Sequence, residues 1–136
     1  MSRTIPETLR IKVARRANLR CEYCLLPEAY AMYPFEIDHI IAIKHGGKTE
    51  FENLAYSCLR CNRMKGTDLT TIPPGMNDIV RLFNPRKDDW HEHFKVVKGV
   101  VYGQSVIGQA TVQLLAFNTP ERIIGRMLLT EAGEYP

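Results

Sequence analysis

Four cysteines form two C-x-x-C pairs, Cys21/Cys24 and Cys58/Cys61, with 33 residues between the pairs. A C-x-x-C turn brings two sulfur atoms to one point, and two such turns complete the tetrahedral four-sulfur shell that Zn²⁺ accepts in structural sites. The alternative is a set of buried or redox-active thiols, but a thiol redox protein needs one reactive pair near a βαβ pattern, which this sequence lacks. We therefore predict a structural zinc site. Its four thiolates leave no open position for chemistry, so its role is stability, and loss of the metal should unfold this half of the chain.

Four polar residues lie between or just after the cysteines: Asp38, His39, Asn53 and Asn62. Taken singly, each has a structural interpretation. His39 sits in an apolar stretch and could be a hydrogen-bonded core histidine. Asp38 could pair with an arginine, Asn53 could serve as a turn or cap residue, and Asn62 could be an exposed helix residue. Their order, with Gly46-Gly47 in the middle and cysteines at both ends, makes them informative as a set.

In this order, residues 21–66 resemble the zinc-supported subgroup of the HNH endonuclease family. The resemblance implies an α+β fold with a ββα-metal (His-Me finger) core clamped by the four-cysteine zinc site. A first strand is expected at 35–40, a loop at 41–52, a second strand at 53–57 and a helix at 59–65.

The resemblance also implies a role for each polar residue. His39 would be the general base, and Asn53 would brace the loop and help to hold the histidine. Asp38 and Asn62 would hold a catalytic Mg²⁺ or Mn²⁺. Many members of the family have histidine where Asn62 stands, but an amide oxygen also suits a hard cation.

This set fits hydrolysis of DNA. A neutral imidazole, whose ordinary pKa is about 6.5, takes a proton from water near neutral pH. A divalent ion on the scissile phosphate stabilises the charge that builds in the transition state. By the resemblance, the products would carry 5′-phosphate and 3′-hydroxyl ends. The competing hypothesis is a zinc-stabilised nucleic-acid-binding module without catalysis.

The net charge of +3 is only mildly basic, and all of the excess positive charge lies within residues 1–70. Residues 1–70 carry eleven Lys and Arg against eight Asp and Glu, whereas residues 71–136 carry seven against seven. Lys65 lies three residues after Asn62, on the same face of the predicted helix, and is a candidate phosphate contact together with Arg60 and Arg63. For each of the three, a solvated cation is the alternative. For the Lys and Arg residues of the first predicted helix, the same two interpretations remain open: a contact to phosphate or a solvated cation.

The rest of the chain supplies the elements around this module. Pro6 is expected to open a helix that ends near Ala17, with Ile5, Leu9 and Val13 as its apolar stripe. We divide the chain into residues 1–70, the helix and nuclease module, and residues 71–136, an α/β extension packed on it. In this extension we expect a short strand at 79–83, a strand with a bulge or hairpin at Gly99, and helices over 107–117 and 120–132. Trp90, His93 and Phe94 are expected in its core.

The 136 residues suit one compact domain, and the 45% hydrophobic share excludes disorder of the whole chain. The N-terminus has no basic stretch followed by an apolar run, and no stretch of about 18 apolar residues occurs, so we expect neither a signal peptide nor a membrane partner. A cytoplasmic protein is the expectation, with DNA as its partner. A nuclease with one site often needs two copies to cut both strands, so a homodimer is considered.

Overall fold

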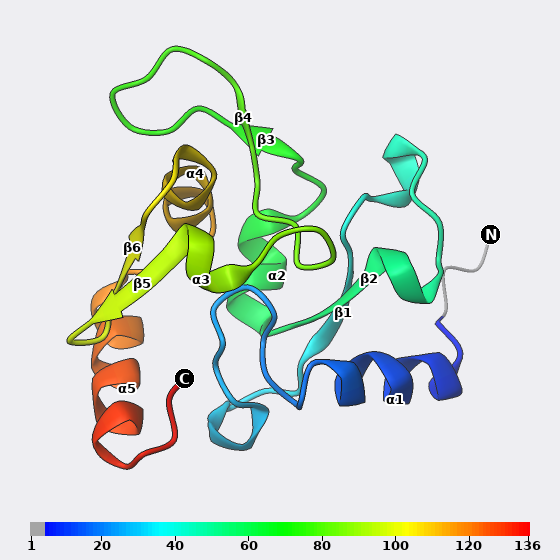
Figure 1. Cartoon of the computed structure of the whole chain (residues 1–136). Helices are drawn as coiled ribbons and strands as arrows, with labels where there is room; N and C mark the ends of the chain where they lie inside the picture. Colours follow the sequence, from blue (N-terminus) through cyan, green and yellow to red (C-terminus); the bar gives the residue numbers. More distant parts are fainter. Residues whose placement is uncertain (1–4) are drawn as a thin grey trace.

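Three two-stranded antiparallel sheets and the helices between them make up residues 5–136, the part of the chain that the computed structural model describes (Figure 1). The predicted α+β class is confirmed. Residues 1–4 of the expected first unit lie outside the described part. Buried apolar side chains from Ile5 to Phe117 form one connected core, so both halves of the chain contribute to it.

The first helix, α1 (Glu7–Arg16), follows Pro6, which is its N-cap rather than its first residue. The predicted stripe faces the core, with Val13 fully buried and Ile5 7% exposed. Arg16, one of the cations whose role was left open, turns inward. Its guanidinium lies 3.8 Å from the centre of the Phe51 ring and donates to the Phe51 carbonyl at 2.8 Å. This arginine therefore anchors α1 to the segment that leads into the second strand.

The predicted strand–loop–strand–helix unit is present. Strands β1 (Glu36–His39) and β2 (Leu54–Ser57) pair antiparallel, with Glu36 opposite Ser57 and His39 opposite Leu54. Helix α2 (Leu59–Lys65) follows directly and ends at Gly66, whose φ of +53° favours glycine. The connection between the strands contains two single turns, η2 (Ile43–His45) and η3 (Phe51–Asn53).

The remaining elements follow in the order of the chain. They are β3 (Thr70–Thr71), β4 (Val80–Arg81), α3 (Trp90–His93), β5 (Phe94–Val97), β6 (Val100–Gly103), α4 (Val106–Leu114) and α5 (Pro120–Glu131). Strands β3 and β4 pair with each other, and β5 and β6 form a hairpin. Its two turn residues, Lys98 and Gly99, both have positive φ, the geometry that two-residue hairpins prefer. The hairpin predicted at Gly99 is therefore confirmed.

The C-terminal elements pack against the first cysteine turn. The Trp90 indole donates to the Tyr23 carbonyl at 2.8 Å, and the Tyr135 hydroxyl donates to the Cys24 carbonyl at 2.8 Å. Trp90 and Phe94 are buried, as expected, with ring centroids 4.8 Å apart, whereas His93, expected in the core with them, is only half-buried. None of the helices between residues 5 and 136 is long and apolar enough to cross a membrane.

Candidate functional site

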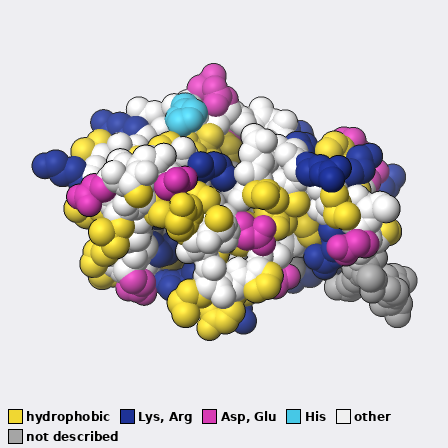
Figure 2. All heavy atoms as spheres, turned by 90° about the horizontal axis from the view of Figure 1, so that it is seen from below, with side chains coloured by type: hydrophobic (Ala, Val, Ile, Leu, Met, Phe, Trp, Pro, Cys, Tyr) yellow, Lys and Arg dark blue, Asp and Glu magenta, His cyan; other side chains and the backbone are white. Residues whose placement is uncertain are grey.

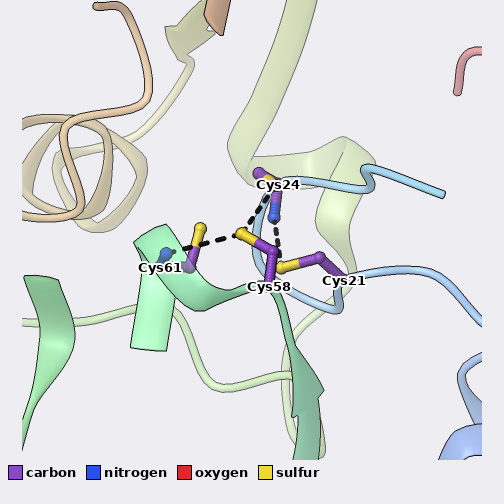
Figure 3. A group of neighbouring side chains, drawn as sticks. All are labelled: Cys21, Cys24, Cys58 and Cys61. Carbon is purple, nitrogen blue, oxygen red and sulfur yellow. Dashed lines mark hydrogen bonds between the residues drawn. The ribbon is translucent and has the colours of Figure 1, made fainter. Parts of the chain in front are cut away.

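The four cysteines converge between the first cysteine turn and the start of α2 (Figure 3). Cys21 and Cys24 come from the turn after α1, Cys58 caps α2 and Cys61 lies in its first turn. Their sulfur atoms all lie within 4.8 Å of one another, and none of the four residues is more than 3% exposed. In each pair, the amide of the second cysteine donates to the sulfur of the first at 3.4 Å. Two turns of the same shape thus face one point.

The chemistry of this cluster fits a bound metal. Burial raises the pKa of the Cys21 and Cys61 thiols, whereas hydrogen bonds from the other cysteines, Cys21 first, lower the pKa of Cys24. A cation that binds all four sulfurs compensates the burial of their negative charges, and four thiolates at one point are a common ligand set of structural Zn²⁺. The cysteines are therefore positioned to bind a metal, and a structural zinc site is supported.

Arg122, from α5, lies beside the sulfurs. Its Nη2 is 3.0 Å from the Cys61 sulfur, and its Nη1 donates to the carbonyls of Leu115 and Ala116 at 2.9 and 3.0 Å. Burial lowers the pKa of the guanidinium, but the sulfurs, Cys61 first, raise it by more, so the group stays charged. This cation offsets part of the negative charge of a four-thiolate site and ties α5 to it. Arg122 was not among the residues predicted from the sequence.

At the other end of the ββα unit, Asp38 and His39 are neighbours on β1 with different surroundings, because successive side chains of a strand point to opposite faces. Asp38 is 4% exposed, whereas His39 is half-buried. The His39 Nε2 atom lies 2.8 Å from the Thr49 hydroxyl in the connecting loop. The loop therefore orients the imidazole of the expected general base.

Asp38 belongs to a buried polar cluster. Its Oδ2 accepts from the Tyr23 hydroxyl at 2.6 Å and lies 3.1 Å from the Lys65 Nζ atom. Burial raises the pKa of Asp38, while Lys65 and Tyr23 act in the opposite direction by stabilising the carboxylate. Within residues 5–136, Oδ1 has no hydrogen-bond partner. Oδ2 of Asp38 therefore makes internal contacts that stabilise the fold, whereas Oδ1 makes none with a described residue.

Lys65 does not lie where a phosphate contact requires it. It is 3% exposed, and besides Asp38 its ammonium group contacts the carbonyls of Ile40 at 3.1 Å and His39 at 3.3 Å. The helix face that carries Lys65 packs on β1, where these oxygens satisfy the buried charge. The expected DNA contact at Lys65 is thus replaced by an internal one that supports the backbone of the histidine.

Asn53 bridges the two ends of the loop. Its side-chain oxygen accepts from the Ile41 amide at 2.9 Å, and its nitrogen donates to the carbonyls of Ile41 and Lys48 at 2.9 and 2.8 Å. Gly47 makes the same region compact, because a Cβ atom there would lie 1.7 Å from the Ile41 carbonyl oxygen. The Asn53 hydrogen bonds and the close packing at Gly47 therefore hold the two ends of the loop together.

The other expected site residues lie on α2. Asn62 is half-buried, and within the described chain no hydrogen bond satisfies its side-chain amide. Arg63 is exposed and makes no ion pair with any described residue. Arg60 is exposed and lies 3.5 Å from the Glu121 carboxylate. The structure thus leaves Arg60 and Arg63 at the surface and takes Lys65 into the interior.

Comparison with known proteins agrees with the geometry of the first half. Residues 21–68 match the model of the HNH endonuclease family, which confirms the predicted resemblance for this segment. The Septu protein PtuB of Bacillus thuringiensis is 26% identical over 124 residues, which cover 89% of this chain and 46% of that protein. The chain therefore spans about half the length of this curated relative. No solved structure matches the chain.

Proposed function

We propose that this chain is a metal-dependent endonuclease that hydrolyses phosphodiester bonds of DNA, with His39 as the general base. The observation that carries this proposal is the coincidence of the family match over residues 21–68 with one local arrangement. His39 ends β1, Asn53 precedes β2, and Asn62 lies on the helix that follows.

His39 would take a proton from the attacking water. Thr49 contacts Nε2 and so keeps the imidazole in one orientation, while Lys65 contacts the His39 carbonyl from behind. Asn53 holds the loop that carries Thr49 through its contact with Lys48, the residue before it. An imidazole whose orientation is fixed in advance loses little conformational entropy when it accepts the proton from water.

The residues that would hold the catalytic ion are Asp38 and Asn62. Each offers a side-chain oxygen that no hydrogen bond to a described residue occupies, and oxygen ligands suit Mg²⁺ or Mn²⁺. When bound, such an ion supplies positive charge for the transition state and for the departing 3′ oxygen. The products would carry 5′-phosphate and 3′-hydroxyl ends.

Arg60 and Arg63 are the α2 cations that remain available for the DNA backbone. The proposed setting is the cytoplasm, where thiols remain reduced and available to zinc. Cleavage of both strands by one site per chain would require a homodimer or two successive encounters.

The test is cleavage of supercoiled plasmid by zinc-loaded protein in Mg²⁺ or Mn²⁺, with and without EDTA. We expect nicking that His39→Ala abolishes while zinc content and circular dichroism stay unchanged. His91→Ala is the matched control, because His91 is an exposed histidine on α3 and has no part in the proposed site. If the wild-type protein binds plasmid but nicks it under no condition, the chain is instead a zinc-stabilised nucleic-acid-binding module.

A further inference from the structure

A groove of about 400 Å³ opens beside the cysteine cluster, at the other end of the ββα unit from His39. It is lined by the loop that contains η1 (Glu28–Tyr30), by the start of α2 and by one face of α5. Its volume is in the range of small-molecule sites rather than of a flat protein interface. The site proposed above uses none of its walls except α2.

Large apolar side chains line this groove and are not covered by other described residues of the chain. Tyr30 is 53% exposed, Tyr33 60% and Met32 90%. The loop that carries them is firmly held, because the Glu28 carboxylate accepts from the Phe35 amide at 3.0 Å and from the Tyr56 hydroxyl. The face that Figure 2 shows has apolar side chains interspersed with basic and acidic ones. Exposed aromatic side chains on a fixed loop indicate a surface that binds something flat and apolar.

The same groove carries positive charge. Arg60 and Arg63 line it, and Glu121 is the acidic residue among its lining residues. The pair between Arg60 and Glu121 spans 3.5 Å between side chains that are 49% and 68% exposed, so it is weak and easily exchanged. Arg63 has no ionic partner among residues 5–136. The groove therefore favours a ligand that joins an aromatic ring to an anion.

Two segments of the chain, α2 and the residues that lead into β1, run from the groove toward the proposed catalytic site. Arg60 and Arg63 flank Asn62 in the sequence of α2, and Phe35, which lines the groove, lies four residues before His39. Along an extended strand, four residues span about 13 Å. At about 3.4 Å per nucleotide along a stacked strand, this corresponds to about four nucleotide steps. A strand held at His39 can reach the groove.

On the premise of the proposed function, we propose that this groove binds an unpaired nucleotide of the DNA substrate. The base stacks on the tyrosines of the loop, and the phosphate contacts Arg63 and Arg60. Stacking on aromatic side chains accepts any base, so the groove selects unpaired structure rather than sequence. A paired base cannot enter, because its partner strand and its neighbours hold it in the stack.

The test is binding of zinc-loaded protein to a duplex with one unpaired 2-aminopurine nucleotide and to the fully paired duplex, both without Mg²⁺ or Mn²⁺ and without chelator, so that no cleavage occurs and the zinc stays bound. We expect the unpaired duplex to bind about tenfold more tightly, with quenching of the 2-aminopurine fluorescence. Tyr33→Ala and Arg63→Ala should each remove most of this preference. Tyr102→Ala and Lys87→Ala, which alter exposed residues that do not line the groove, should retain it.

Equal affinity for the two duplexes would overturn the proposal, as would a preference that Tyr33→Ala leaves intact. If the groove variants instead turn a dimer into a monomer in sedimentation and leave DNA binding unchanged, the groove binds a second copy and the proposal is wrong. Nicking in Mg²⁺ is measured separately. Nicking without a preference for the unpaired duplex refutes only the proposed binding of a nucleotide in the groove. A preference for the unpaired duplex without nicking refutes only the proposed endonuclease activity.

Discussion

Lys65 and Asp38 form an ion pair in the interior, directly behind the histidine of the candidate site. The two charged atoms are 3.1 Å apart, and the side chains are 3% and 4% exposed. Such a pair is costly to bury, and it is retained only when further hydrogen bonds satisfy both partners. Tyr23 supplies one to the carboxylate, and the carbonyls of His39 and Ile40 accept two from the ammonium group.

The first prediction follows from this pair. Lys65→Met should lower the free energy of unfolding by about 3–5 kcal/mol, because it leaves the Asp38 carboxylate buried without its cation. The double variant Lys65→Met/Asp38→Asn should recover part of this loss. Urea denaturation of the zinc-loaded proteins measures both values, with Lys95→Met at an exposed position as the control. A Lys65→Met protein within about 0.5 kcal/mol of wild type, as expected only for a surface site, would contradict the internal role.

The second prediction concerns Arg122 and the sulfur cluster. Arg122→Gln removes the charge 3.0 Å from the Cys61 sulfur, so the thiolates repel one another more strongly. Loss of such a supporting group costs about tenfold or more in metal affinity. Competition with a chromophoric chelator measures this directly. Arg126→Gln is the control for general destabilisation, because Arg126 is a buried arginine of the same helix that bonds to the carbonyls of Gly99 and Phe117 rather than to sulfur. Equal zinc affinity in Arg122→Gln and wild type would show that the contact has no electrostatic effect.

The third prediction uses two glycines. Gly47→Ala should displace the loop, because the new Cβ atom would lie 1.7 Å from the Ile41 carbonyl oxygen and 2.9 Å from the Asn53 side-chain nitrogen. We expect loss of most nicking activity. Gly125→Ala is the same change in α5, where nothing lies within 4 Å, and should stabilise the helix by about 0.5–1 kcal/mol. Because Gly125 lines the groove, this variant is a control for stability and not for activity. Similar thermal unfolding of the two variants, or wild-type nicking by Gly47→Ala, would refute the special role of Gly47.

The ββα unit could be predicted from the sequence because its signals are local. Two cysteine pairs, a β-rich stretch before His39 and Gly66 after the last turn of α2 lie within 46 consecutive residues, 21–66. The hairpin at Gly99 was visible for the same reason, since a two-residue turn depends on its own backbone conformation.

The surroundings of the site could not be predicted in this way. The spacing placed Lys65 and Asn62 on one helix face, but which part of that face packs on β1 depends on tertiary contacts, and Lys65 became an interior residue. Arg122 lies 61 residues from its sulfur partner, and an arginine carries no pattern that marks it for a thiolate. Tyr23 was visible only as a residue between two cysteines, although its hydroxyl reaches Asp38.

The last prediction concerns Thr49, whose hydroxyl lies 2.8 Å from the His39 Nε2 atom. Thr49→Val keeps the shape of the side chain and removes the hydrogen bond, so the imidazole loses its orientation. We expect kcat for nicking to fall by about tenfold with little change in KM, since the base acts in the chemical step and not in DNA binding. Thr49→Ser should restore most of the rate.

The dependence of this rate on pH separates positioning from a merely structural role. A histidine base is protonated in mild acid, so the wild-type rate should fall as the pH drops below about 6. The midpoint of this fall should move in Thr49→Val, because the hydrogen bond affects the charged and neutral imidazole unequally. A wild-type rate that stays flat from about pH 8 to 5 would exclude His39 as the base. A Thr49→Val enzyme with wild-type kcat and midpoint would show that Thr49 does not position it.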